Sequence, residues 1–356
     1  KFLKMSVKTF VKNSKLLYNN APKCTVILGN QSADLDSVVS AISLAYYFTC
    51  KSAQQRVYIP IMNSTPLIQG TKKEFILMLD YLSLGLEDFI YVADWKKCTI
   101  EGAMLVDHNE LDAGEKSLIN DETFVTSVID HHLDNRLFLN TQPRIVDTRV
   151  GSCISLIVDL IKQSAISLDS SFADMMLVPI LSDTCNLTLR THQIDLDAVA
   201  YLRQFSSLEQ LEPLYARLQQ AKFTFDPNEN VQTLLAKDYK ACDDQWAMSA
   251  VTFSLVEWAN ETHMDDLFKF KRDRSLRFYG CLSFFQSGAN EFKRDLILLG
   301  DSDLLSEFLQ LNVENLTLAE NNLSKEYLIF NVENAALTRK HWQPLLAQFL
   351  KQSKHF

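Results

Sequence analysis

Two adjacent histidines, His131 and His132, lie between Asp130 and Asp134, and this polar cluster directly follows the apolar run 125–129. The apolar run predicts a buried strand, so the polar cluster lies at the strand's carboxyl end, where open α/β sheets bind ligands. His131 can supply a nitrogen ligand to a metal ion, and His132 can contact a phosphate or donate a proton. Adjacent histidines are as often ordinary surface or core residues, so the pair alone leaves both interpretations open.

Further acids follow predicted elements in the same half of the chain. They are Asp34 and Asp36 after the strand 25–29, Asp107 after the strand 103–106, and Asp183 after the buried helix 172–181. Each has a simpler structural explanation: Asp36 or Ser37 can cap the next helix, Asp107 can form a turn, and Asp183 can pair with a cation. Considered together, acids that all lie at the same predicted edge of the sheet are improbable as independent helix caps or turns. Carboxylates beside an imidazole suit two divalent cations that activate water for attack on phosphorus.

Neighbours of these acids have possible supporting roles. His108 and Asn109 can orient the Asp107 carboxylate, and Asp130 can fix the tautomer of either histidine.

The order of the elements predicts the fold that positions these groups. Strands and helices alternate from 25–29 to 172–181, a pattern typical of a doubly wound, mainly parallel α/β sheet. A length of 356 residues favours two domains. We place the first domain at 1–215, a linker at 216–228 and a smaller mixed-sheet α/β domain at 229–356. A further short strand is expected at 89–92.

Composition limits the classes of function. Apolar residues make up 47% of the chain and charged residues 22%, as in soluble globular proteins, and no apolar run approaches the length of a membrane span. Seven scattered cysteines without a CxxC pair favour a reducing compartment. A net charge of −9 disfavours general nucleic-acid binding. We expect a cytoplasmic monomer without membrane or nucleic-acid partners; the acid-free, lysine-containing start of the sequence leaves a mitochondrial location open.

Phosphate binding also requires positive charge, because phosphoryl transfer depends mostly on positioning and charge stabilisation. Candidate cations in the second domain are Lys240, Arg339, Lys340 and two members of the basic run 269–277, Arg272 and Arg274. Taken singly, such groups are more often solvated charged surface.

In combination, these motifs resemble those of the DHH phosphoesterase superfamily. They occur in that superfamily's order over nearly the whole chain: NQSADLDS (30–37), VDHNE (106–110), IDHH (129–132), VGSC (150–153), SDT (182–184) and TRK (338–340). The chain is most similar to the branch that holds family II inorganic pyrophosphatases and fungal-type cytosolic exopolyphosphatases. This resemblance implies a DHH metal-binding catalytic domain, a C-terminal phosphate-binding domain, and an active site in the cleft between them.

The resemblance also implies a role for each candidate residue. Metal binding would involve Asp36 and Asp107 as bridges between two divalent ions, His131 and Asp183 at one site, and Asp34 at the other. The ions would be Mg²⁺, or else Mn²⁺ or Co²⁺. Substrate binding would involve His132 at the scissile phosphate, with Lys240, Arg339 and Lys340 on other phosphates; Arg272 and Arg274 are our candidates for a channel that holds a longer chain.

Asn30 distinguishes the two groups of this branch. The pyrophosphatases have a histidine at this position, whereas the exopolyphosphatases have asparagine, as does this chain. Loss of an imidazole ligand shifts the preference of that site towards magnesium. We therefore count Asn30, with Asp36, Asp107 and His132, among the candidate catalytic residues.

The favoured function is an exopolyphosphatase that hydrolyses the terminal phosphoanhydride of linear inorganic polyphosphate, with a metal-bridged water as nucleophile. Short-chain or nucleoside polyphosphates are possible further substrates. The alternatives are an inorganic pyrophosphatase of the family II type and a non-catalytic polyphosphate-binding or scaffold protein; a nuclease is disfavoured by the net acidity.

Overall fold

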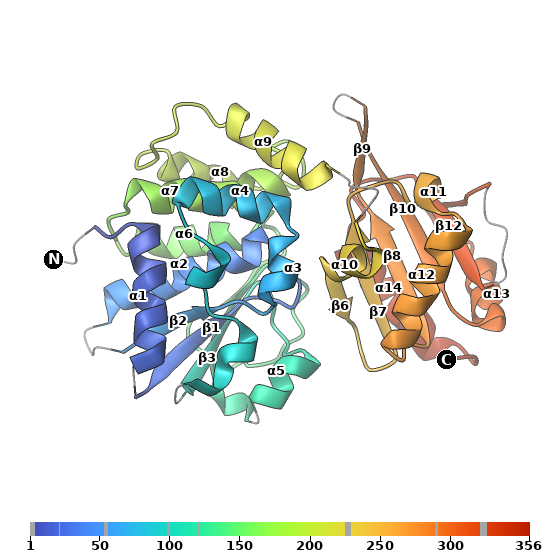
Figure 1. Ribbon diagram of the computed structural model, residues 1–356, viewed down its shortest axis with the longest axis horizontal. Helices are drawn as coiled ribbons and strands as arrows, with labels where there is room; N and C mark the ends of the chain where they lie inside the picture. Colours follow the sequence, from blue (N-terminus) through green and yellow to red (C-terminus); the bar gives the residue numbers. More distant parts are fainter. Residues whose placement is uncertain are drawn as a thin grey trace. The chain divides into compact units, whose positions relative to one another are not determined.

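The computed structural model describes residues 4–20, 22–52, 56–97, 100–119, 121–224, 229–288, 291–320 and 326–356. Contacts divide the chain into two compact units, Lys1–Ala221 and Lys222–Phe356, each built on its own sheet (Figure 1). The boundary falls within the predicted linker 216–228. The first part of that range is the end of helix α9 (Glu212–Phe223) rather than loop, and 225–228 lie outside the described residues. Within the described ranges, no helix is long and apolar enough to cross a membrane.

Unit 1 contains a five-stranded parallel sheet in the order β2-β1-β3-β4-β5. Its strands are β1 (Cys24–Leu28), β2 (Tyr58–Ile61), β3 (Ile100–Val106), β4 (Val125–Asp130) and β5 (Arg144–Val146). β1 pairs with β2 on one side and with β3 on the other, so the direction of winding reverses between β1 and β3. Open α/β sheets bind ligands beside such a switch point. Asn30 and Asp107 follow these two strands.

Helices cover both faces of this sheet. They are α1 (Val7–Asn20), α2 (Leu35–Lys51), α3 (Pro66–Gly70), α4 (Lys73–Leu82), α5 (Ala113–Leu118), α6 (Cys153–Gln163), α7 (Ser170–Asp183) and α8 (Gln193–Leu202), with 3₁₀ turns at Leu86–Asp88, Val92–Lys97 and Glu122–Phe124. Successive β1 residues alternate between two cores: Ile27 packs with α2, α6 and α7, whereas Val26 and Leu28 pack on the opposite face. This confirms the predicted doubly wound, parallel α/β sheet.

Two local features differ from the sequence-based expectation. The range 89–92 forms an isolated bridge between Met62 and Tyr91 and then a 3₁₀ turn, not a strand. Asp94 explains the change, because its carboxylate accepts a hydrogen bond from the Tyr91 N–H at 3.2 Å and draws the backbone into the turn. Helix α1 had no counterpart in the sequence analysis.

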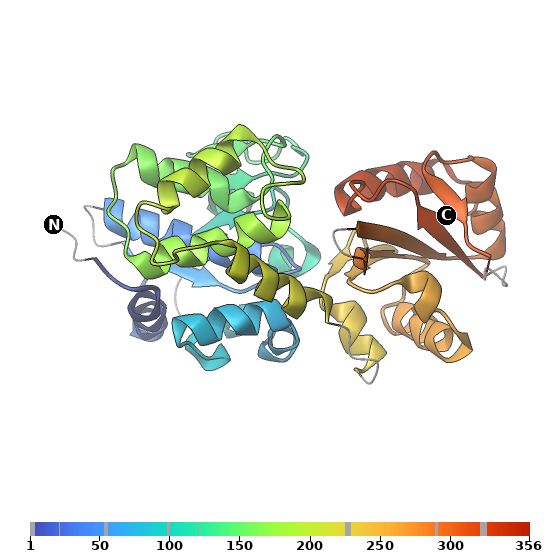
Figure 2. The ribbon, with the colours of Figure 1, turned by 90° about the horizontal axis from the view of Figure 1, so that it is seen from above.

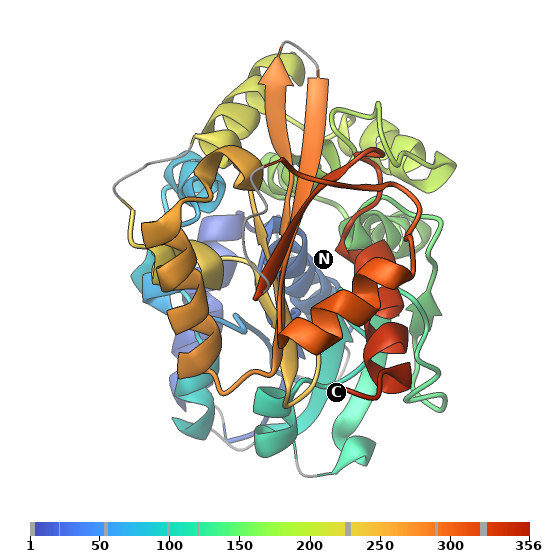
Figure 3. The ribbon, with the colours of Figure 1, turned by 90° about the vertical axis from the view of Figure 1, so that its right-hand side faces the viewer.

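Unit 2 contains a mixed sheet in the order β11-β12-β10-β8-β7-β6, with β9 paired to β10. Its strands are β6 (Tyr239–Ala241), β7 (Trp246–Val251), β8 (Phe278–Ser283), β9 (Phe285–Gly288), β10 (Glu291–Leu299), β11 (Leu316–Leu318) and β12 (Tyr327–Val332). The β7–β8 pair is parallel and the other pairs are antiparallel, which confirms the predicted mixed sheet. β10 continues past β8 to pair with β9, and this hairpin extends at the top of Figure 3.

The sheet of unit 2 separates two helical layers. The helices are α10 (Val231–Ala236), α11 (Leu255–Trp258) and α12 (Glu261–Asp273) on one face, and α13 (Ser302–Gln310) and α14 (Arg339–Gln352) on the other. Figure 2 shows the yellow-to-orange helices and the red helices on opposite sides of this sheet. Alternate strand residues contribute to the two cores, as Phe278 and Tyr279 do. Each side chain of a strand in unit 2 therefore lies on a definite face of the sheet.

Gly29 allows α2 to approach the end of β1 closely. A Cβ atom at this position would lie 2.8 Å from Ser37 Cβ and 2.9 Å from the Ser37 carbonyl oxygen. The same close approach lets Ser37 Oγ accept a hydrogen bond from the Asn30 N–H at 3.2 Å. The first acidic loop is therefore positioned by tight backbone packing.

Gly29→Ala should destabilise the protein by about 1–3 kcal/mol, as overpacking of a filled site does. Urea unfolding of the metal-free protein measures the change. Gly288→Ala is the matched control. Its Cβ would lie 3.7 Å from Glu291 Oε2, an ordinary contact, so the stability of this variant should stay within about 0.5 kcal/mol of wild type. Equal stability of the two variants would contradict the close approach.

Candidate metal centre

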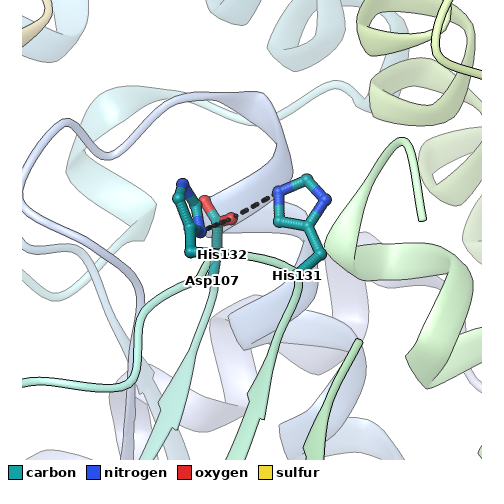
Figure 4. A group of neighbouring side chains, drawn as sticks. All are labelled: Asp107, His131 and His132. Atoms are coloured by element: carbon teal, nitrogen blue, oxygen red, sulfur yellow. Dashed lines mark ion pairs between the residues drawn. The ribbon is translucent and has the colours of Figure 1, made fainter. Parts of the chain in front are cut away.

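Asp107, His131 and His132 lie together at the carboxyl ends of β3 and β4 (Figure 4). Asp107 Oδ1 lies 3.1 Å from His131 Nε2 and 3.6 Å from His132 Nδ1. One possible ligand atom from each residue lies within 4.8 Å of the others. Carboxylate and imidazole donors at this spacing can hold a divalent metal ion.

The tautomer of His131 is set by the backbone. Its Nδ1–H donates to the Val150 carbonyl at 3.1 Å, so Nε2 faces the carboxylates. Nε2 lies 3.6 Å from Asp36 Oδ2 as well as 3.1 Å from Asp107 Oδ1. A histidine held in this way by a carbonyl presents its other nitrogen as a metal ligand.

Asp107 has a backbone conformation that few side chains adopt. Its φ is 61°, in the left-handed region, where aspartate is more common than most residues. Its Oδ2 accepts hydrogen bonds from Asn30 Nδ2 at 2.7 Å and from Ser37 Oγ at 2.5 Å. These two donors fix the plane of the carboxylate and leave Oδ1 directed at His131.

Asn30 lies beside Asp107 and acts as a hydrogen-bond donor to it. Its side-chain oxygen accepts from the Ser32 N–H at 2.9 Å and from Ser32 Oγ at 2.6 Å, while its nitrogen donates to Asp107. Both ends of the amide are thus used within the protein. Asn30 supports the carboxylate of Asp107 rather than adding a ligand.

Asp36 lies in the first turn of α2 and contacts the N-terminus of another helix, α6. Its Oδ2 accepts from the Cys153 N–H at 2.6 Å and its Oδ1 from the Ile154 N–H at 2.9 Å. These N–H groups have no partners within their own helix, and the helix dipole favours a negative charge there. Neither Asp36 nor Ser37 caps α2. Asp34 is the N-cap, and its carboxylate accepts from the Ser37 N–H at 3.0 Å.

Electrostatics indicate that these acids need a cation. Burial, followed by the charges of Asp107 and Asp183, raises the pKa of the Asp36 carboxyl well above its usual range. Asp183 is the last residue of α7, two residues beyond the predicted end of this helix at 181, and its charge acts on this site. Buried carboxylates that repel one another are stabilised by a bound divalent cation. The donor set of Asp36, Asp107 and His131 therefore fits a metal ion; Asp34 is engaged as a helix cap.

Asp130 determines the orientation of His132. Its Oδ1 accepts from the His131 N–H at 2.7 Å, the His132 N–H at 3.1 Å and His132 Nδ1 at 2.8 Å. Burial opposes the charge on Asp130, but the charge and hydrogen bond of His132 outweigh it and lower the pKa of the Asp130 carboxyl. The His132 side chain is 25% exposed.

His108 and Asn109 do not orient Asp107, contrary to the expectation from the sequence. His108 Nδ1 lies 2.8 Å from the Val106 carbonyl and its Nε2 lies 3.0 Å from Glu115 Oε1. Asn109 Nδ2 instead donates to Asp130 Oδ2 at 2.5 Å. The two side chains stabilise α5 and the histidine loop respectively.

Two of the predicted cations, Arg339 and Lys240, lie on one face of unit 2. Arg339 begins α14, and its Nη2 lies 2.7 Å from Asp238 Oδ1 while its Nη1 donates to the Asp238 carbonyl at 3.0 Å. Lys240 pairs in register with Met248, whose side chain belongs to the α13–α14 core, so Lys240 shares that face. Burial raises the pKa of the Cys242 thiol to about 12, and the charges of Arg339 and Lys240 oppose this, which indicates that both cations lie near it. Lys340 follows Arg339 and is exposed.

Arg272 and Arg274 do not share this face. The Arg274 guanidinium lies 3.5 Å from the centre of the Phe270 ring and 5.3 Å from that of Tyr239, both in the core beneath α12. Arg272 is exposed in the last turn of α12. The sheet therefore lies between these arginines and Lys240. The channel predicted from the basic run gains no support from this arrangement, since Arg274 has a packing role.

Residue types alone did not reveal the supporting groups of the centre. Ser37 donates to Asp107, and the backbone of 150–154 contacts His131 and Asp36. The sequence VGSC in this range was recognised as a motif but had no assigned role. Gly151 is the residue type that could have indicated a tightly packed turn here. A Cβ atom added at this position would lie 2.6 Å from the Arg190 carbonyl oxygen.

Comparison with known proteins gives consistent results. Residues 24–180 match the family model described as "DHH family, N-terminal domain". The chain is 27% identical over 287 residues to "Exopolyphosphatase PRUNE1" of Rattus norvegicus, a match that covers 77% of this chain and 62% of that protein. It is 28% identical over 337 residues to the "Putative exopolyphosphatase" of Schizosaccharomyces pombe, which covers 84% of this chain and 83% of that protein. The chain thus spans less than two thirds of the rat protein.

A solved structure has the same fold. The "putative family II inorganic pyrophosphatase" of Methanococcus jannaschii aligns with a TM-score of 0.62 at 18% sequence identity, over 92% of this chain and 99% of that one. At this identity the likeness shows the fold alone.

The His108–Glu115 pair should make stability depend on pH. Burial lowers the pKa of His108, but Glu115 outweighs this and raises it from 6.5 to about 9. Because the folded-state pKa exceeds the unfolded one, the stabilisation is complete below pH 6.5 and is lost as pH rises towards 9. Unfolding free energy, measured with chelator present, should fall by up to about 3 kcal/mol across this window. Glu115→Gln should flatten the profile; an unchanged slope would contradict the assignment.

Proposed function

We propose that this chain is a metal-dependent hydrolase of phosphoanhydrides of the DHH phosphoesterase superfamily; the proposal rests on the match of residues 24–180 to the DHH family model and on the geometry of the metal centre. The observation that carries the proposal is the convergence of Asp36, Asp107 and His131 at one sheet edge, with burial and like charge raising the pKa of Asp36. A divalent cation bound there would supply a Lewis acid that activates water and neutralises phosphate oxygens.

Side chains of the protein would orient the metal ligands and contact the substrate. Val150 holds the proton at His131 Nδ1, and Asp130 engages His132 at Nδ1. The partly exposed His132 ring lies beside the Asp107 carboxylate, where it can contact a phosphate oxygen. Asn30 and Ser37 keep the Asp107 carboxylate in its orientation.

We further propose that the substrate is linear inorganic polyphosphate and that the enzyme releases the terminal phosphate. Two relatives named as exopolyphosphatases match 77% and 84% of the chain. The amide of Asn30, used entirely for hydrogen bonds, adds no ligand at the position where the related pyrophosphatases have an imidazole. A site with oxygen-rich donors favours magnesium over softer transition metals. Two ions, Mg²⁺ or Mn²⁺, are our proposal for the complete site.

Orthophosphate release from long-chain polyphosphate, tripolyphosphate and pyrophosphate, each with Mg²⁺ and then Mn²⁺, tests this function. We expect polyphosphate and tripolyphosphate to be hydrolysed much faster than pyrophosphate, because their additional phosphates can make further contacts with cationic side chains. Asp107→Ala should reduce release to the level without enzyme. A preference for pyrophosphate would show that the protein is an inorganic pyrophosphatase instead. Full activity of the Asp107→Ala variant would refute the metal centre.

Arg339 should bind substrate and Arg274 should not. We expect Arg339→Ala to raise KM for tripolyphosphate about ten- to a hundredfold with a smaller effect on kcat, since hydrogen bonds to charged groups contribute about 1.5–3 kcal/mol. Arg274→Ala is the matched control, because its guanidinium packs on Phe270 on the other face of the sheet. A larger KM effect of Arg274→Ala would restore the channel hypothesis.

A further inference from the structure

The Val150 carbonyl sets the tautomer of His131, so the position of the segment that contains Val150 affects the metal centre. The same short segment, 150–154, leads into α6 and supplies the N–H groups of Cys153 and Ile154 that contact Asp36. Cys153 Sγ also donates to the Ile129 carbonyl of β4 at 3.3 Å. Two candidate ligands therefore depend on where this segment lies.

Asp195 is the charged side chain that contacts this segment from outside the centre. It lies in the first turn of α8 and is completely buried. Its Oδ2 accepts from the Gly151 N–H at 2.9 Å and from the His192 N–H at 3.0 Å, and its Oδ1 accepts from Ser155 Oγ at 2.7 Å. One carboxylate thus connects the turn before α6, the first turn of α6 and the start of α8.

Packing around Gly151 makes this connection rigid. A Cβ there would lie 2.6 Å from the Arg190 carbonyl oxygen, 2.6 Å from Thr184 Cγ2 and 3.1 Å from Asp195 Oδ2. The turn therefore fits directly against the backbone between α7 and α8. Thr184 follows Asp183, so the same packing includes the end of α7 that carries another predicted ligand.

We propose that Asp195 is a positioning residue of the metal centre: it fixes the 150–154 turn, and through the Val150 carbonyl and the N-terminus of α6 it directs His131 and Asp36. This inference rests on the proposed metal centre. Asp195 itself does not touch the ligands. Its effect passes through one backbone carbonyl and two backbone N–H groups.

The hydrogen bonds show which part of the side chain matters. An amide in place of the carboxylate can still accept from Gly151 and His192 through its oxygen, and its NH₂ group can donate to Ser155 Oγ. Asp195→Asn should therefore preserve the turn. Asp195→Ala removes the acceptor of both N–H groups and leaves the buried Gly151 N–H without a partner, so the turn moves.

Asp174 provides a matched control for loss of a buried carboxylate. It is 1% exposed and accepts hydrogen bonds from Tyr81 Oη at 2.7 Å, Ser206 Oγ at 2.5 Å and Ser207 Oγ at 2.6 Å. It lies in the first half of α7, whereas Asp183 is the last residue of that helix. Asp174→Ala should lower stability without moving the metal ligands.

Binding of Mn²⁺ alone, without substrate, tests the proposal. The free Mn²⁺ signal in electron paramagnetic resonance gives the affinity of each full-length variant, and thermal unfolding gives its stability. We expect Asp195→Ala to weaken Mn²⁺ binding about 10- to 100-fold, the range for groups that orient metal ligands. Asp195→Asn should restore binding to within a few-fold of wild type, and Asp174→Ala should bind as wild type does at comparably reduced stability.

Two results would overturn the proposal: wild-type affinity in Asp195→Ala, or an equal loss of affinity in Asp174→Ala. If Asp195→Ala does not fold, Ser155→Ala removes only the hydrogen bond to Oδ1 and should weaken Mn²⁺ binding in the same direction; no change would count against Asp195. Failure of the wild-type protein to bind Mn²⁺ would instead refute the metal centre, so the two failures are distinguishable.

Discussion

The candidate site depends on the burial of negative charge at one edge of a parallel sheet. Asp36 and Asp107 are 3% and 2% exposed, and isolated buried carboxylates cost several kcal/mol each. The structure offsets part of this cost with donors: the N-terminus of α6 for Asp36, and Asn30 with Ser37 for Asp107. Each donor also fixes an orientation. The hydrogen bonds that make burial tolerable are therefore the same ones that orient Asp36 Oδ2 and Asp107 Oδ1 towards His131.

Local sequence patterns were sufficient to locate the strand ends. The apolar runs of β1, β3 and β4 each lead into a polar group, and the carboxyl ends of parallel strands share one edge. The strand order could not be obtained in this way. It is the placement of β1 beside β3 that brings Asn30 within 2.7 Å of Asp107 Oδ2. Pairing of strands that are distant in sequence depends on the whole packed unit rather than on any one run.

Side-chain partners were the least predictable part, for the same physical reason. Asp36 looked like a helix cap because of its position, but its oxygens meet a helix that begins 117 residues later. His108 lies next to Asp107 in sequence yet turns to Glu115. In unit 2, alternation along β6 places Tyr239 and Lys240 on opposite faces. Nothing in the sequence showed that Arg274 packs on the Tyr239 side, because that depends on where α12 lies.

Much of the support for the site is backbone, which explains why residue types did not reveal it. Almost every residue has a backbone carbonyl and an N–H group. The roles of the Val150 carbonyl and of the Cys153 and Ile154 N–H groups therefore cannot be inferred from residue types. Backbone dipoles held at a helix end need little reorganisation when a charge changes beside them, which is the basis of electrostatic preorganisation. Asn30 adds a side-chain donor to this support: its amide donates to Asp107 Oδ2 and helps hold that carboxylate in its orientation.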